Sequence, residues 1–320
     1  MSGHVSGHVS GRVGGRVATP RVVCAVGGHA DELFALRSPS RPGQSVPASV
    51  RSDAGGCALN VAAGLAASGA GVTHAGLRGS DAAGAMVADA LRRHGVGDAA
   101  LVLPDVATGR YAALVEPDGT LALAAAAMGI YARAGELADH APFTLACEGA
   151  DALLLDANGP PGAAEMLADR RGGAALALLA TSARKAPVLA SLMARAEVVF
   201  ANAGEWAALG DGATESGVTG SGATGSGVTG RIALAFVTDG ARGASALRYG
   251  EEIARAAPPA GPLRDVVGGG DAFAAGALHA VLTGADPAEA LRRGLACAAR
   301  CVAHEGALGW LADGPSTGGA

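Results

Sequence analysis

Aromatic residues and long apolar runs are both scarce in this sequence. Phe, Trp and Tyr together make up 3% of its 320 residues, although hydrophobic residues as a whole make up 50%. The core must therefore be built mainly from Ala, Val and Leu, and a chain of this length can bury one large domain. Because no run of about 18 uninterrupted apolar residues occurs, we expect no membrane-spanning helix and no membrane partner.

The sequence also lacks an excess of positive charge. Its formal net charge is −5 at pH 7, and charged residues make up 17% of the chain. A protein that binds nucleic acid or an anionic membrane surface normally carries a basic patch, so this balance argues against both kinds of partner.

Paired cysteine motifs are absent as well. The five cysteines are Cys24, Cys57, Cys147, Cys297 and Cys301, an odd number with no Cys-x-x-Cys spacing. Cys297 and Cys301 lie four residues apart and could supply half of a metal site, but no His or Cys cluster completes it. We expect reduced, buried cysteines and a cytoplasmic location.

Three segments have a low-complexity composition that cannot build a packed core. Residues 1–19 repeat Gly, Val and polar residues and contain no apolar segment of the kind found in signal peptides. Residues 212–230 repeat Gly, Ser and Thr, and residues 313–320 are similar. We expect a disordered tail at each end and one flexible loop within a single domain that spans residues 20–312.

Strands and helices are expected to alternate along much of the remaining chain. Short apolar runs predict buried strands, and apolar residues at helical spacing between them predict helices. This alternation produces a parallel sheet with helices on both faces. The expected strands are 21–28, 150–158, 174–181, 197–202 and 232–240, and the expected helices are 58–69, 81–95, 161–170, 185–195 and one that begins near Ala203.

Residues 31–54 and 109–128 differ in character from this αβ pattern. Both segments alternate in polarity, and the second contains Pro117-Asp118-Gly119, which is typical of a hairpin turn between two short strands. We expect the two segments to form a small separate sheet that is inserted into the larger αβ body.

The stretch Gly268-Gly269-Gly270-Asp271 stands where a helix is expected to begin. Glycines at a helix start let backbone N–H groups converge on an anion such as a phosphate, and the helix dipole adds partial positive charge there. Asp271 could then take a proton from a hydroxyl group that attacks the phosphate. An ordinary helix N-cap would explain the same four residues, so this motif alone does not decide between the two interpretations.

Two motifs together resemble the ribokinase-like (PfkB-type) carbohydrate kinases. One is DVVGGGDAFAAG, which begins at Asp265, and the other is Gly55, Gly56 and Asn60 in GGCALN. They occur in the order found in that family, and the resemblance extends from about residue 21 to about 312. It implies an α/β, ribokinase-like three-layer αβα fold with a mainly parallel central sheet and a small β lid.

The resemblance also implies which residues bind and react. Asp271 would be the catalytic base, and Gly268, Gly269 and Gly270 would form the anion hole. The residues that hold sugar hydroxyls would be Asp31, Gly55, Gly56 and Asn60. The register leaves open whether Asp31 or Glu32 takes this role, and His29 stands where the family usually has asparagine.

ATP and Mg²⁺ are the cofactors that the resemblance implies, and a need for K⁺ stays open. The element FANAGEWAAL is similar to the family's N-x-x-E element, in which Glu205 would hold the metal through water. The cofactor-binding residues would be Asn202, Glu205, Thr238, Gly240 and Gly243. An N-cap followed by a first-turn acid would also explain Asn202 and Glu205.

Some residues depart from the family pattern. Val266 and Val267 stand where threonine is frequent, Gly269 replaces an alanine, and the expected strand 174–181 lacks the aspartate that is usual at its end. Another group would have to replace that aspartate if it steadies the site.

Within the family, the sequence is most similar to pseudouridine kinases. Residues 41–62, residues 107–131 and the turn from Ser182 to Lys185 resemble segments of those enzymes, although Ala127 stands where they often have aspartate. The function implied is an ATP-dependent phosphorylation of a ribose-type hydroxyl of a nucleoside or sugar, with pseudouridine to pseudouridine 5′-phosphate as the first candidate.

Other functions stay open at this point. A ribokinase, an adenosine- or inosine-type kinase, or a ligand-binding homologue that has lost turnover would share most of these residues. A Rossmann dehydrogenase is a weaker interpretation, because no G-x-G-x-x-G follows the first strand. The small sheet has edges and an apolar face that need covering, so it could close over the sugar and also form a homodimer.

Overall fold

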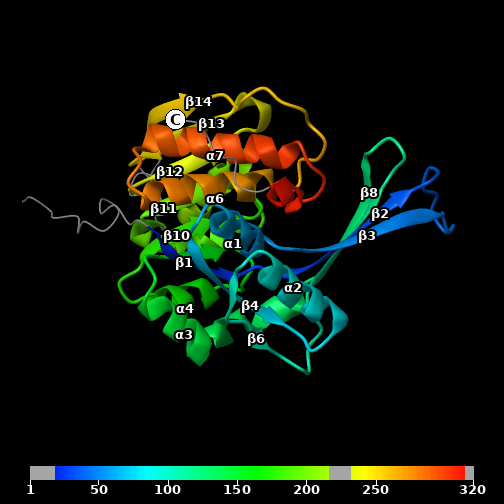
Figure 1. Ribbon diagram of the computed structural model, residues 1–320, viewed down its shortest axis with the longest axis horizontal. Coiled ribbons are helices and arrows are strands. Elements are labelled where there is room, and N and C mark those ends of the chain that lie inside the picture. The colour runs from blue at the N-terminus through cyan, green and yellow to red at the C-terminus, as the bar shows by residue number, and fades with distance from the viewer. Residues whose placement is uncertain (1–18, 216–231, 314–320) are drawn as a thin grey trace, which may run out of the picture.

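The protein is seen in a computed structural model that describes residues 19–215 and 232–313 (Figure 1). Residues 1–18 of the expected tail 1–19, residues 314–320 of the expected tail 313–320, and residues 216–230 of the expected flexible loop lie outside the described residues. The described chain forms an αβα body with a separate small sheet, as the sequence predicts.

A large, mainly parallel sheet forms the centre of the body. Its strands are β1 (Arg21–Val26), β4 (Gly71–Arg78), β5 (Gly97–Asp98), β6 (Leu101–Val102), β9 (Ala152–Asp156), β10 (Ala175–Leu179), β11 (Val198–Asn202), β12 (Ala235–Thr238), β13 (Ala244–Arg248) and β14 (Glu251–Ala256). They lie in the order β14-β13-β12-β11-β10-β9-β1-β4-β5, with β6 beside β4. The strands from β12 to β5 run parallel, whereas β13 and β14 form an antiparallel edge that the sequence patterns did not predict.

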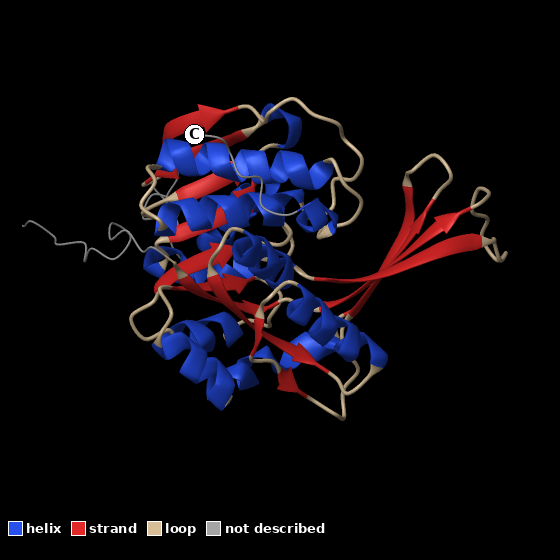
Figure 2. Ribbon diagram, in the orientation of Figure 1, coloured by secondary structure: helices blue, strands red, loops and turns tan. Residues whose placement is uncertain are grey.

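Helices cover both faces of this sheet (Figure 2). One face carries α1 (Cys57–Ala67), α2 (Ala82–Arg93), α6 (Gly269–Leu282) and α7 (Pro287–Val302). The other carries the 3₁₀ segments η1 (Gly129–Asp139) and η2 (Ala186–Arg195) together with α3 (Ala141–Glu148), α4 (Ala163–Asp169) and α5 (Ala203–Glu215). Two shorter 3₁₀ turns, η4 (Gly240–Arg242) and η5 (Gly309–Asp313), follow β12 and α7 in the chain.

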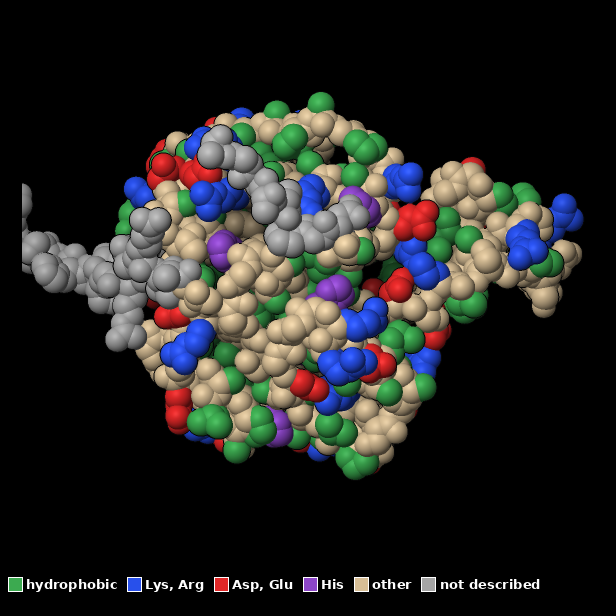
Figure 3. All heavy atoms as spheres, viewed as in Figure 1, with side chains coloured by type: hydrophobic (Ala, Val, Ile, Leu, Met, Phe, Trp, Pro, Cys, Tyr) green, Lys and Arg blue, Asp and Glu red, His purple; other side chains and the backbone are tan. Residues whose placement is uncertain are grey.

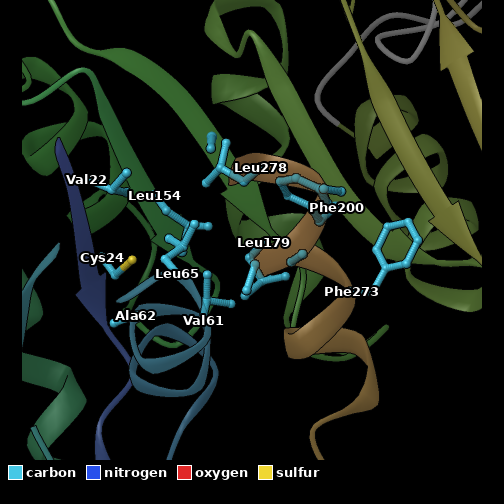
Figure 4. Close-up of a cluster of buried hydrophobic side chains, with 14 of the residues drawn as sticks. Val22, Cys24, Val61, Ala62, Leu65, Leu154, Leu179, Phe200, Phe273 and Leu278 are labelled. Carbon is cyan, nitrogen blue, oxygen red and sulfur yellow. The ribbon is translucent and has the colours of Figure 1, made fainter. Parts of the chain in front are cut away.

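The central strands are buried on both faces, which is why they are continuous apolar runs in the sequence. In β1, for example, Val22 and Cys24 contact the α1 and α6 side, and Val23 and Ala25 contact the opposite side. Figure 4 shows the first of these two cores, where helix side chains such as Leu65 and Leu278 meet the strands.

Three of the few aromatic residues gather in one place within this core. Phe200 and Phe236 stack with ring centroids 5.6 Å apart, and Phe273 meets Phe236 edge to face at 6.0 Å. These residues join β11, β12 and α6, so the rings hold the start of α6 against the ends of two strands. Elsewhere the core is filled mainly by aliphatic side chains, with Tyr131, Phe143 and Trp310 as further buried aromatic residues.

The small sheet consists of β2 (His29–Leu36), β3 (Ala48–Gly55), β7 (Arg110–Val115) and β8 (Leu121–Ala127), in the order β3-β2-β7-β8. It projects from the body as an arm (Figure 1), and hydrophobic side chains lie among polar ones on its surface (Figure 3). The Pro117–Gly119 turn joins β7 to β8 as expected, with Gly119 at a φ of 86°. We refer to this sheet as the lid.

Two local expectations were wrong. The expected helix 185–195 is a 3₁₀ segment, η2, and its buried residues Ala186, Leu189 and Leu192 recur every three positions, which fits three residues per turn. The expected flexible loop was placed too early, because residues 212–215 continue helix α5.

Candidate active site

The start of α6 lies beside the carboxyl ends of the central strands, where open α/β sheets bind ligands. Gly268 precedes α6 with a φ of 79°, and a Cβ at this position would lie 2.6 Å from the Cα of Ala307. Only glycine fits here without a backbone shift. Asp265 fixes the preceding turn, because its carboxylate accepts hydrogen bonds from the N–H groups of Val267 (3.0 Å) and Gly306 (2.9 Å).

The glycines of this turn differ in their surroundings. The N–H of Gly269 donates to the carbonyl of Val266 at 3.3 Å and is used within the turn. A Cβ on Gly270 would meet no described atom within 4 Å, and Gly270 lines a cavity. The open space beside the N-terminus of α6 therefore lies at Gly270, where an anion could approach the backbone.

Asp271 and Asn60 meet at the centre of the site, although 211 positions separate them in the sequence. The side-chain Nδ2 of Asn60 donates to Oδ2 of Asp271 at 2.8 Å. Burial raises the pKa of Asp271 to about 7, against the opposing effect of hydrogen bonds from Asn60 and Cys57. The Oδ1 of Asn60 is buried without a partner among the described residues, so it can accept a hydrogen bond from a ligand.

A cavity of about 260 Å³ extends from Asp271 across the ends of β10, β11 and β12. Its lining includes polar groups from several elements: Cys57, Thr181, Asn202, Glu205, Thr238 and Asp271. The rings of Phe200, Phe236 and Phe273 form part of its wall. The cavity therefore brings the glycine-aspartate motif at the start of α6 together with residues expected to bind a nucleotide.

Asn202 and Glu205 form a reciprocal capping box at the start of α5. The N–H of Glu205 donates to Oδ1 of Asn202 at 2.9 Å, and the N–H of Asn202 donates to Oε2 of Glu205 at 2.8 Å. Glu205 is 6% exposed, and burial raises the pKa of its carboxyl. The pair thus caps the helix and also lines the cavity, where carboxylate and amide oxygens are suitable for Mg²⁺ and its bound water.

The three remaining cofactor-binding candidates occupy different positions. Thr238 ends β12 and lines the cavity. Gly240 and Gly243 lie at η4 with φ values of 54° and 94° and are not among the residues that line the cavity. A Cβ on Gly243 would lie 2.0 Å from the carbonyl oxygen of Ala256, so this glycine allows β12, β13 and β14 to pack closely.

The predicted sugar-binding residues gather where the lid joins the body. A Cβ on Gly55 would lie 2.0 Å from Oδ2 of Asp31, so the carboxylate rests against that glycine. Gly56, with a φ of 106°, begins α1 and lies against the backbone of Gly27. Glu32 points to the other face of the lid, where it pairs with Arg110 at 2.7 Å.

Sequence reasoning missed a buried carboxylate at the end of β9. Asp156 accepts hydrogen bonds from the N–H groups of Gly27 (3.0 Å) and Ala58 (3.1 Å), so it joins β1 to α1. Its Cα partner in the sheet is Leu179, next to the position where the expected aspartate of β10 is missing. An acid at the carboxyl end of a parallel strand was a signal that could have identified it.

A lysine extends this network. Asn158 donates its Nδ2 to Asp156 at 2.9 Å and accepts a hydrogen bond from Nζ of Lys185 at 2.6 Å. Burial raises the pKa of the Cys57 thiol well above its usual value, as do Asp271 and Asp156, and the charge of Lys185 acts in the opposite direction. Lys185 therefore lies near the acceptor end of the site.

The cysteines carry no recognisable metal site. Cys24, Cys147 and Cys301 are buried, Cys57 and Cys297 are partly buried, and all five are free thiols. Within residues 19–215 and 232–313, no group of three or more His, Cys, Asp or Glu side chains could hold a metal ion on its own. In the same part of the chain, no helix is long and apolar enough to cross a membrane.

Comparison with known proteins gives a consistent result. The model of the pfkB family of carbohydrate kinases matches residues 24–311. A 1-phosphofructokinase of Rhodobacter capsulatus is 36% identical over 253 residues, which cover 77% of this chain and 78% of that protein.

Solved structures agree with that match. A carbohydrate kinase from Agrobacterium tumefaciens is 29% identical, with a TM-score of 0.75 and coverage of 92% of this chain and 96% of that chain. Ribokinase from Thermotoga maritima has the same fold, with a TM-score of 0.74 at 20% identity over 91% of this chain and 95% of that chain.

Proposed function

The chain belongs to the pfkB family of carbohydrate kinases, which use ATP to phosphorylate an alcohol group, and on this premise we propose that its acceptor is a ribose-type hydroxyl of a nucleoside, with pseudouridine as the first candidate. The observation that carries the kinase chemistry is the contact between Asn60 and Asp271, which brings together at the start of α6 two motifs that lie 211 positions apart in the sequence. The observation that favours a nucleoside is the negative charge around the acceptor end of the site.

Asp271 is the general base in this proposal. A pKa of about 7 suits a group that must accept a proton near neutral pH. As the acceptor hydroxyl gives its proton to Asp271, its oxygen bonds to the γ-phosphorus of ATP, and the bond from that phosphorus to the bridging oxygen of ADP breaks. Asn60 holds the carboxylate in place throughout.

The turn before α6 receives the negative charge of the phosphoryl group. Backbone N–H groups of the segment 268–271 and the positive end of the helix dipole would stabilise it, with Gly270 giving the closest access. Mg²⁺ would neutralise the phosphate oxygens, and Glu205 and Asn202 would hold its bound water. Thr238 would contact the nucleotide from β12, with Gly240 and Gly243 shaping the loop behind it.

Asp31, Gly56 and Asn60 would hold the hydroxyl groups of the acceptor. Asp31 lies at Gly55, whereas Glu32 is engaged by Arg110 on the other face of the lid, so the geometry supports Asp31. Closure of the lid over the acceptor would exclude water and prevent simple hydrolysis of ATP.

An uncharged acceptor fits the charge at this end of the site. Asp31, Asp156 and Asp271 lie at this end, and burial raises the pKa of Asp156 and of Asp271. In their ionised forms they would repel a phosphorylated sugar unless a cation held its phosphate. Lys185 is a cation in reach, but Asn158 already accepts a hydrogen bond from it. The motifs shared with pseudouridine kinases then favour that nucleoside over ribose.

A fructose phosphate is the second candidate. The 36% identity to a 1-phosphofructokinase supports it. Lys185 would then have to turn from Asn158 to the substrate phosphate.

A phosphorylation screen tests both candidates. Purified enzyme with Mg-ATP is assayed against pseudouridine, uridine, adenosine, inosine, ribose and fructose 1-phosphate, with and without K⁺. We expect the highest kcat/KM for pseudouridine. The variant Lys185→Met separates the candidates, because it should raise the KM for fructose 1-phosphate by about tenfold or more if Lys185 binds the phosphate. Preference for fructose 1-phosphate, lost in that variant, would contradict the nucleoside proposal.

A further inference from the structure

A line of three side chains runs from the body of the protein to the acceptor-binding carboxylate. The hydroxyl of Tyr131 lies 2.8 Å from Nδ1 of His29, and Nε2 of His29 lies 3.1 Å from Oδ1 of Asp31. Tyr131 is 3% exposed and the side chain of His29 is 12% exposed, so water competes little for these contacts.

The hydrogen-bond roles along this line follow from its outer end. The carboxylate of Asp31 can only accept, so the proton of a neutral His29 imidazole lies on Nε2. Nδ1 is then left to accept from the O–H of Tyr131, whose oxygen also accepts from the N–H of Gly28 at 3.0 Å. Burial raises the pKa of Tyr131 well above its usual value, so the hydroxyl keeps this proton. The N–H on Nε2 of that neutral imidazole faces Oδ1 of Asp31 at 3.1 Å.

The two carboxylate oxygens of Asp31 then have different surroundings. Oδ1 faces Nε2 of His29 at 3.1 Å, and Oδ2 lies against Gly55, next to the Gly56 that precedes α1. His29 therefore sets the rotation of the carboxylate and leaves Oδ2 for an acceptor hydroxyl.

All four connections between the lid and the body meet around His29. His29 begins β2, and its Cα partner Gly55 ends β3. Gly109 precedes β7, and a Cβ there would lie 3.2 Å from the Cβ of His29. Tyr131 follows β8 in η1. A movement of the lid relative to the body would thus change the contact between His29 and Asp31.

We propose that His29 is a positioning residue that fixes Asp31 for the acceptor hydroxyl and couples this contact to the lid through Tyr131. The proposal rests on the proposed kinase function, since it concerns the same acceptor. His29 does not touch the reacting atoms, so its loss should affect acceptor binding more than the chemical step.

Three variants of His29 test this role. His29→Ala removes the imidazole that faces Asp31 and should raise the acceptor KM by about tenfold, the size of effect typical of one polar contact to a carboxylate. His29→Gln places an amide N–H near the position of Nε2 and should restore the KM to within about threefold of wild type. His29→Asn is the matched control, because its shorter amide reaches only the position of Nδ1 and should not restore it. The KM for ATP should stay unchanged in all three, and melting temperatures show that each is folded.

A double-mutant cycle distinguishes positioning from a general structural effect. If His29 acts through Asp31, adding His29→Ala to Asp31→Asn should raise the acceptor KM no further. The proposal would be overturned if the double variant raised the acceptor KM by the product of the two single effects. It would also be overturned if His29→Gln and His29→Asn had equal acceptor KM values. If the wild-type enzyme phosphorylates none of the screened acceptors, the proposed function fails. Failure of the His29 proposal is different, because it is seen only in the variants of an active enzyme.

Discussion

Asp271 combines a pKa near neutrality with a fixed position, and this predicts the pH dependence of the reaction. The base must be ionised to accept a proton, so kcat/KM should fall about tenfold per pH unit below a pH of about 7 and level off above it. Steady-state rates between about pH 5 and 9 measure this. The residual activity of Asp271→Asn, followed over the same range, controls for ionisation of Mg-ATP. A wild-type rate that is flat down to about pH 5 would show that Asp271 is not the base.

His74 is a buried histidine beneath the same site, and it predicts acid-sensitive stability. Its Nε2 contacts the carbonyl oxygen of Gly27 at 3.0 Å, and burial lowers its pKa from 6.5 to about 4. The unfolded chain therefore binds a proton that the folded protein does not, so this contribution is present above pH 6.5 and is lost as the pH falls toward 4.

The variant His74→Gln isolates this effect, since its amide can still donate to Gly27. Wild type should lose about 3 kcal/mol of unfolding free energy relative to the variant between neutral pH and pH 4. The raised pKa of Asp271 acts in the opposite direction over part of this range, and the comparison removes it because both proteins retain Asp271. Urea titrations of both proteins at each pH measure this. If the difference in unfolding free energy between them did not change with pH, the assignment of the effect to His74 would be wrong.

At the scale of the element, two glycines at the start of α6 are expected to have different roles: Gly268 a structural one and Gly270 a functional one. Gly268→Ala places a side chain at a φ of 79° against Ala307, and should lower stability by about 1–3 kcal/mol. Gly270→Ala meets open space and should keep or slightly raise stability. Its methyl group would nevertheless occupy the space proposed for the phosphoryl group, so kcat should fall by about tenfold or more.

Thermal melts and kcat measured on both variants decide this comparison. Full activity in a stable Gly270→Ala enzyme would show that the phosphoryl group binds elsewhere.

Several elements of the body could be predicted from sequence because they carry their own local signals. Buried parallel strands are apolar runs, and α2 begins at Asp81, whose side chain accepts from the N–H of Gly84 as an N-cap should. The edge strands β13 and β14 lack such runs and were missed. The central strand β4 was missed as well, because Thr73, His74 and Gly76 interrupt its apolar residues.

The site was predicted less completely because its contacts are long-range. The family resemblance supplied Asp271 and Asn60, but nothing local to either residue indicates the hydrogen bond between them. The choice between Asp31 and Glu32 depends on which face of β2 each occupies, and the alternation of a strand fixes that face only once its start is known. Asp156 was overlooked because its partners Gly27 and Ala58 lie far from it in the sequence, at separations of 129 and 98 positions.

At the scale of the whole molecule, the apolar side chains on the lid face opposite Asp31 lead us to expect a homodimer. Phe34 pairs with Val50, and Leu114 pairs with Leu123, so an apolar row crosses the sheet on the face opposite Asp31. Val50 is 59% exposed and Leu123 is 62% exposed. We propose that two lids pack through this row, because an isolated small sheet needs a cover for its apolar face.

Sedimentation velocity at micromolar concentration measures the oligomeric state. Leu123→Lys should convert a dimer to a monomer, whereas Leu145→Lys, an exposed leucine in α3, is a control that should not. A wild-type protein that sediments as a monomer would rule out the dimer and leave the role of the lid in closure intact.

The kinase account as a whole depends on Asp271, and Asp271→Asn tests it most directly. Asparagine keeps the size of the side chain and a hydrogen-bond partner for Asn60, but it cannot accept the proton of the hydroxyl group. The measurement is kcat for the best acceptor, taken together with ATP affinity and melting temperature on the same protein. We predict that kcat falls by about 10²–10⁴-fold while ATP binding and the fold persist. A variant whose kcat stays within about threefold of wild type would contradict the assignment of Asp271 as the base.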